Sequence, residues 1–109
     1  MIEALWSVEF VAANGNSGGG VVIFESGRIF GGDSSYYYVG SYQVNGSDIS
    51  GKVRVNHYYG EVNNIFGDYK EVTLEFSGRI QAEQFIVEGI AKEPNSNAKI
   101  RLTRRSELP

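Results

Sequence analysis

The chain has 109 residues and a formal net charge of −3, with a pI near 5.1, and its length fits one domain around one hydrophobic core. The absence of cysteine and the presence of a single histidine exclude disulfides, thiolate metal sites and a His-rich metal site. The acidic balance argues against direct nucleic-acid binding, which needs a basic surface. We therefore expect a single domain over residues 1–109 without a cofactor.

The N-terminal residues show neither the basic segment nor the apolar run of a signal peptide. No apolar run approaches the roughly 20 residues that cross a bilayer as a helix. A hydrophobic content of 41% is too high for a disordered chain. The sequence thus predicts a folded cytoplasmic protein without membrane association.

In the first half of the chain, apolar and polar residues alternate with a period of two, which is typical of strands with one buried face. The pattern predicts strands at about residues 6–12, 18–25, 28–30, 36–44 and 49–57. Short glycine-containing turns separate several of them. Asn14-Gly15 and Asn45-Gly46 are the strongest of these signals, because both central positions of a tight hairpin turn favour positive φ.

The second half of the chain predicts three more strands, at about residues 71–76, 83–91 and 99–103. Residues 58–69 form the longest connection, in which Ile65 and Phe66 are apolar enough to pack back on the core. Residues 93–97 are expected to be a loop, and residues 104–109 a tail.

Eight strands joined by short turns favour an all-β, antiparallel up-and-down barrel with at most one short helix. A barrel also leaves no unpaired strand edge. A two-sheet sandwich is the alternative. Period-two alternation predicts a core that includes Trp6, Phe10, Val53, Val55, Leu74 and Phe76.

Few residues of the sequence suggest a phosphate-binding or catalytic site. Gly18-Gly19-Gly20 lacks the Lys and Ser or Thr of a phosphate-binding loop and enters a strand, so a strand start or bulge where backbones approach closely explains it better. Asp33 is interpreted as a turn residue that accepts hydrogen bonds from nearby backbone amides. His57 is interpreted as a buried, hydrogen-bonded histidine, and Glu71 and Glu75 as solvent-facing. We therefore expect no catalytic site and no enzyme activity.

The tyrosines are the most informative side chains. Tyr36, Tyr38 and Tyr42 share one face of their predicted strand, and Tyr37 lies on the other. Cross-strand aromatic packing is one interpretation. The other is a contact surface for a partner or a second copy of the chain, because tyrosine is enriched at interfaces. Since seven tyrosines and six phenylalanines exceed what a narrow barrel holds, we expect at least one of the four outside and a homodimer.

Residues 27–42, together with Trp6 and Gly19-Gly20-Val21, resemble the GrlR family of negative regulators of type III secretion. The resemblance implies a lipocalin-like (calycin) barrel that dimerises and has no enzyme activity. It also implies binding to a protein partner, which in the best-known member is a transcriptional activator held off DNA.

That member carries four consecutive acidic residues in the loop after the fourth strand, where this chain has Asn45, Gly46, Ser47 and Asp48. The partner-binding loop is thus mostly lost here. Our leading interpretation is a GrlR-like regulator or adaptor that acts by protein binding. The alternative is a carrier or sensor of a small apolar ligand. A barrel filled by Phe10, Val53, Leu74 and Phe76 would favour the regulator, and a large apolar cavity would favour the carrier.

Overall fold

The computed structural model describes residues 2–109. Within this range the chain forms eight strands and no helix, so no helix there is available to cross a membrane. The strands are β1 (Ala4–Ala12), β2 (Ser17–Glu25), β3 (Arg28–Gly32), β4 (Tyr36–Asn45), β5 (Asp48–His57), β6 (Glu71–Arg79), β7 (Gln84–Lys92) and β8 (Asn95–Ser106).

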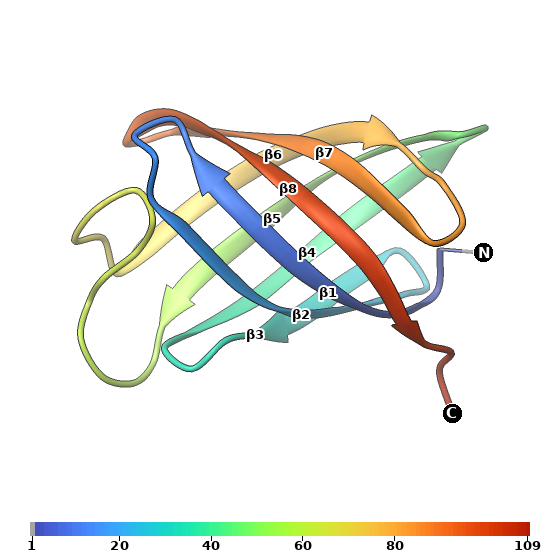
Figure 1. Cartoon of the computed structure of the whole chain (residues 1–109), viewed down its shortest axis with the longest axis horizontal. Helices are drawn as coiled ribbons and strands as arrows, with labels where there is room; N and C mark the ends of the chain where they lie inside the picture. The colour runs from blue at the N-terminus through green and yellow to red at the C-terminus, as the bar shows by residue number, and fades with distance from the viewer. Residues whose placement is uncertain (1) are drawn as a thin grey trace.

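The eight strands form one closed barrel (Figure 1). Each strand pairs antiparallel with the next, and β8 closes the barrel against β1 with Val8 opposite Leu102. The all-β, up-and-down barrel predicted from the sequence is confirmed, and the sandwich alternative is wrong. Closure pairs every strand on both sides, so no edge is left to pair with another chain.

Period-two alternation decides which side chains enter the barrel, and β6 shows it most simply. Val72, Leu74 and Phe76 are buried, whereas Glu71 and Glu75 face outward. Buried alternate residues of the other strands complete two clusters, a larger one that includes Trp6 and a smaller one around Leu74. The predicted core positions Trp6, Leu74 and Phe76 are buried, and Phe10, Val53 and Val55 pack against the core while remaining partly exposed.

β8 is longer than the sequence predicts. Asn95–Asn97, expected to be loop, pair with the last three residues of β7, and Arg104 and Ser106, expected in a tail, pair with β1. These polar residues lack strand propensity. Backbone hydrogen bonds to two neighbouring strands hold them extended instead, a tertiary effect that local pattern does not report.

One end of the barrel, which we call the closed end, is filled by the aromatic side chains of Trp6, Phe24, Tyr42 and Phe85. Trp6 is fully buried, and its indole Nε1 donates a hydrogen bond to the Ile2 carbonyl oxygen at 2.9 Å. The Phe85 ring meets the Trp6 ring edge-on at 5.1 Å between centroids. The ring centroids of Phe24 and Tyr42 are 5.1 Å apart. The four aromatic side chains therefore fill this end of the barrel.

The other end, which we call the open end, carries the β1–β2, β3–β4 and β5–β6 connections (Figure 1). The long β5–β6 connection folds back over it, as the sequence predicts. Phe66 is buried, and Ile65 packs against the smaller core cluster. The side-chain amides of Asn14 and Asn16 both donate to the Ile65 carbonyl oxygen, at 3.1 and 3.2 Å. These bonds tie the connection to the β1–β2 turn.

Candidate functional site: a cavity at the open end of the barrel

The interior of the barrel holds a cavity of about 300 Å³ that reaches the turns of the open end. Its walls are mainly apolar side chains of several strands, among them Val8, Phe10, Val22, Val55, Leu74, Phe76 and Leu102. The volume lies at the lower limit of small-molecule sites. Phe24 and Phe85 of the closed end also line the cavity, so the packed rings form its inner limit.

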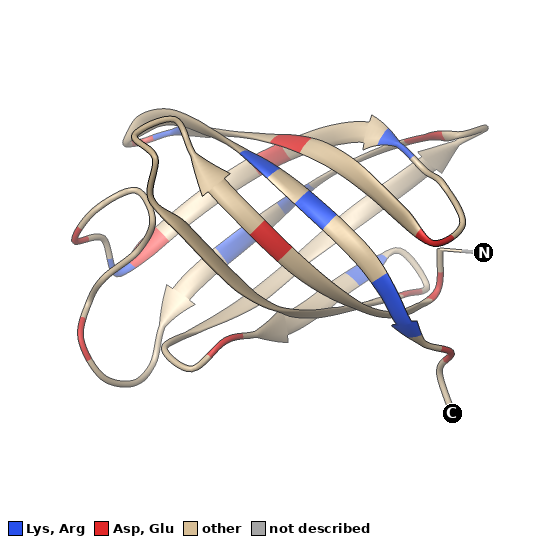
Figure 2. Cartoon of the chain, viewed as in Figure 1, with Lys and Arg blue, Asp and Glu red and all other residues tan. Residues whose placement is uncertain are grey.

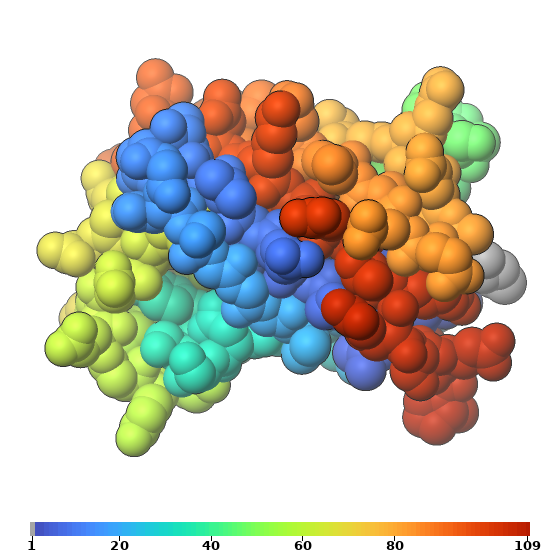
Figure 3. All heavy atoms as spheres, viewed as in Figure 1, coloured from blue at the N-terminus to red at the C-terminus, as the bar shows by residue number. Residues whose placement is uncertain are grey.

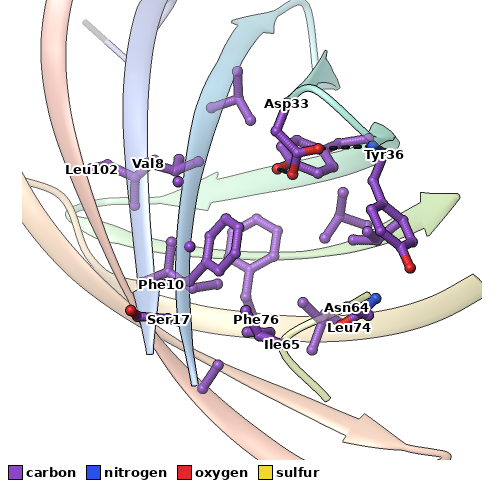
Figure 4. Close-up of a pocket in the computed structure, with 18 of the residues that line it drawn as sticks. Val8, Phe10, Ser17, Asp33, Tyr36, Asn64, Ile65, Leu74, Phe76 and Leu102 are labelled. Atoms are coloured by element: carbon purple, nitrogen blue, oxygen red, sulfur yellow. Dashed lines mark hydrogen bonds between the residues drawn. The ribbon is translucent and has the colours of Figure 1, made fainter. Parts of the chain in front are cut away.

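Polar groups gather where the cavity meets the open end. They come from the start of β2, from the β3–β4 turn and from the β5–β6 connection, and they are Ser17, Asp33, Ser34, Ser35, Asn63 and Asn64. Figure 4 shows Asp33 directed from its turn toward the interior that Phe10 and Phe76 occupy. An apolar chamber with a few convergent polar groups at one end is the usual form of a small-ligand site.

Asp33 is held in a defined geometry. Its Oδ1 accepts hydrogen bonds from the backbone N–H groups of Ser35, at 2.8 Å, and Tyr36, at 2.7 Å. The turn role predicted from the sequence is therefore confirmed. Its Oδ2 accepts a hydrogen bond from the Tyr38 hydroxyl inside the barrel, and this second role was not predicted.

Burial and the Asp33 carboxylate raise the pKa values of two tyrosines that line the cavity. Burial raises the pKa of Tyr38 far above its usual range, and the hydrogen bond to Asp33 raises it further. Burial and the nearby Asp33 charge also raise the pKa of Tyr36, whose hydroxyl donates to the Tyr69 carbonyl oxygen at 2.8 Å. Both phenols therefore stay protonated at neutral pH and act as hydrogen-bond donors.

The glycines of β2 make room for rings that line the cavity. A Cβ on Gly18 would lie 2.7 Å from Cε2 of Phe10, and one on Gly20 would lie 2.7 Å from the Tyr38 hydroxyl. Side chains at these positions would displace the rings. The glycine run therefore serves close packing, although the approaching groups are mostly side chains.

The four tyrosines proposed as a contact surface do not lie together on the outside. Tyr36, Tyr38 and Tyr42 are buried in the barrel, because β4 directs alternate side chains inward. For these three, the surface interpretation is wrong. Tyr42 packs against the Phe24 ring and Tyr36 against the His57 ring, whereas the partner of Tyr38 is Asp33. Tyr37 is 45% exposed, so it remains as the expected outer tyrosine, with its ring 6.3 Å from that of Tyr58.

The loop that matches the GrlR acidic loop lies at the closed end, away from the cavity. Asn45 pairs with Asp48 across a tight hairpin turn in which Gly46 has a φ of 66°. Asp48 is exposed and lies 3.8 Å from the Arg79 guanidinium. The single acid of this loop is therefore already next to a basic group of its own chain.

His57 ends β5 beside the open end and is half-buried rather than fully buried. Its Nε2 lies 2.8 Å from the Gly60 carbonyl oxygen, and the Tyr36 ring meets it edge-on at 5.3 Å between centroids. These contacts fit the hydrogen-bonded structural role predicted for it. Across residues 2–109 no cluster of three acidic, His or Cys residues could hold a metal ion.

A second feature, which sequence reasoning missed, is an apolar area on the outside of β1–β4. Leu5, Ile23, Phe30 and Val39 lie in one cross-strand row, and Val21 and Tyr37 flank Gly32 in the next. We call these six side chains the outer apolar face. Apolar residues at positions that should be polar in an antiparallel barrel were a signal available in the sequence.

No protein-family model and no curated protein matches this chain. The fold is that of an eight-stranded antiparallel β-barrel protein.

Proposed function

We propose that this protein is a non-enzymatic carrier or sensor that binds a small apolar ligand inside its barrel. The observation that carries the proposal is the apolar cavity of about 300 Å³ reaching the open end. A filled barrel would have favoured the regulator interpretation. Because Phe10 and Phe76 line a cavity instead of filling it, the carrier interpretation takes first place.

The cavity also sets the size of the ligand. At roughly 30 Å³ per water molecule, about 300 Å³ is the space of some ten waters. A ligand of about ten non-hydrogen atoms reaches micromolar affinity if each atom contributes about 0.8 kcal/mol, within the range of about 0.3–1.5 kcal/mol seen for small ligands. A short aliphatic chain or one small ring system fits this description.

The test is a fluorescence titration with a neutral naphthyl probe whose emission rises in apolar surroundings. We expect saturable binding to the wild type. Val8→Phe places extra volume in the cavity and should weaken binding at least about tenfold, at a packing cost of roughly 1–3 kcal/mol. Val44→Phe is the matched control, because Val44 is 45% exposed and does not line the cavity. Absence of saturation, or equal binding by both variants, would contradict the proposal.

A second candidate function, protein binding, is favoured by the outer apolar face. Its six side chains carry no charge, and β2 bears no charged residue before Glu25 (Figure 2). In Figure 3 the side chains of β1, β2 and β8 form a continuous surface, and none of the six side chains lines the cavity. We propose that a second copy of the chain covers this face. Arg28, whose guanidinium lies over the Phe30 ring, is paired with Glu25. A two-fold contact would then place apolar surface against apolar surface without burying an unpaired charge.

The regulatory role implied by the GrlR resemblance belongs to this second candidate. In it, loops or a part of the barrel that the second copy leaves uncovered would bind a transcriptional activator and hold it off DNA. The loop of Asn45–Asp48 supports this role little, because its one acid lies beside Arg79.

Light scattering tests the contact between copies. The proposal predicts a mass near twice the 12.0 kDa of the chain and a monomer for the double variant Val21→Lys, Tyr37→Lys. Val44→Lys, equally exposed but outside the face, should remain dimeric. A monomeric wild type at tens of micromolar protein would refute the dimer.

A further inference from the structure

We propose that the cavity selects an apolar ligand with a cationic amine head group over one with a carboxylate, and that Asp33 receives the amine. This inference rests on the proposed ligand-binding function and names the class of ligand. It comes from the charges around the cavity, from the unused hydrogen-bonding capacity of Asp33 and from the apolar walls behind it.

The residues that line the cavity include one carboxylate, that of Asp33, and no lysine or arginine. The β5–β6 connection that covers the open end adds Glu61 and Asp68 against Lys70. A ligand that enters from this end therefore meets net negative charge. A carboxylate head would bring a second like charge with no cation to pair with it, whereas an amine head would supply the missing cation.

Asp33 can bind an amine without losing its present partners. A carboxylate has about four lone-pair positions. Oδ1 accepts from two backbone amides, those of Ser35 and Tyr36, while Oδ2 accepts from the Tyr38 hydroxyl alone. One acceptor position on Oδ2 is therefore open, on a residue that lines the cavity. The three existing hydrogen bonds fix the carboxylate before the ligand arrives, so little ordering is needed on binding.

The apolar walls give this one charge a large effect. Val8, Leu74 and Phe76 line the space behind Asp33 and supply no polar group of their own. An ion pair in such surroundings is screened less than one at the surface. The same walls accept the hydrocarbon part of the ligand, so a short alkyl amine satisfies both parts of the site.

Displacement of the neutral naphthyl probe by octylamine, octanol and octanoate tests the inference, because the three differ mainly in the head group. For the wild type we expect octylamine to bind at least about tenfold more tightly than octanoate, with octanol between them. Asp33→Asn keeps an oxygen for the Ser35 and Tyr36 amides and should bring the three affinities within about threefold. Asp48→Asn, which removes an acid at the closed end and outside the cavity lining, should keep the wild-type order.

The outcomes separate the two proposals. If the probe and all three ligands fail to bind, the proposed function fails. If the probe binds but octanoate equals or exceeds octylamine, the cavity stands and the amine preference is overturned. If Asp33→Asn does not fold, amide NMR of the wild type decides. Octylamine must then shift the Ser35 and Tyr36 amide signals more than octanol does, and equal shifts overturn the inference.

Discussion

The two ends of the barrel are built from the same alternating strands yet are filled in different ways. At the closed end, Trp6 is fully buried against Phe24 and Phe85. At the open end, glycines stand where side chains could have entered, and the rings of Phe10 and Tyr38 lie over them beside a cavity. One end of the fold is thus packed with aromatic rings, and the other end borders a cavity.

This division has a physical basis. A narrow eight-stranded barrel has room for its own side chains or for one small ligand. The mutually packed rings of Trp6, Phe24, Tyr42 and Phe85 supply burial that holds the closed end together. The open end can then keep empty space, with its polar groups satisfied by turns such as that of Asp33.

The largest expected effect is at the closed end. Trp6→Ala removes the most buried ring and its hydrogen bond to Ile2. We expect a loss of roughly 3–5 kcal/mol in the free energy of unfolding, measured by urea denaturation. Domains of this size are stable by only about 5–15 kcal/mol, so the variant should be close to unfolding. A loss below about 1 kcal/mol would show that the closed end does not carry the stability.

Alkaline pH should weaken the fold through the tyrosine inside the cavity. The pKa of Tyr38 is raised in the folded state, whereas in the unfolded chain it is about 10. Stability is therefore complete below about pH 10 and falls as the pH rises further, by up to about 1.4 kcal/mol per pH unit, because only the unfolded chain loses this proton. Unfolding measured from pH 8 to 11 should fall less steeply for Tyr38→Phe. Equal slopes would contradict the buried, protonated phenol.

Phe10→Ala measures how much a ring at the open end contributes to stability. Phe10 is partly exposed and already borders empty space, so we expect a cost of about 1–2 kcal/mol, below the usual range for a buried phenylalanine. The variant should also bind a bulkier naphthyl probe more tightly than the wild type. A cost as large as that of Trp6→Ala would erase the distinction between the ends.

The smallest effect should come from the hairpin loop at the closed end. Asp48 and Arg79 are both largely exposed, 3.8 Å apart, and such pairs contribute about 0–1 kcal/mol. Asp48→Asn should leave the melting temperature nearly unchanged and should not alter probe binding at the opposite end. A clear loss of probe binding would link the two ends in a way that their separation does not predict.

Much of this fold could be predicted because its main signal is local. Alternation placed Val72, Leu74 and Phe76 inside and Glu71 and Glu75 outside. The extension of β8 could not be predicted in this way, because neighbouring strands impose it on polar residues.

The candidate site was less predictable than the fold. Alternation showed that Tyr36 and Tyr38 share a face, but it did not assign that face to the interior. The contact of Tyr38 with Asp33 depends on how β4 continues from its turn. The cavity itself depends on how completely side chains from distant strands fill a shared volume, which no local pattern encodes.

In the proposed function, the open end binds an apolar ligand while the closed end stabilises the barrel. Titration of isotopically labelled protein with octylamine, followed by NMR, distinguishes the two ends residue by residue. We expect saturable shifts at Val55, Leu74 and the Ser35 amide, with the Trp6 indole signal unchanged. Shifts confined to Val21 and Tyr37 on the outside, or to Trp6, would contradict it.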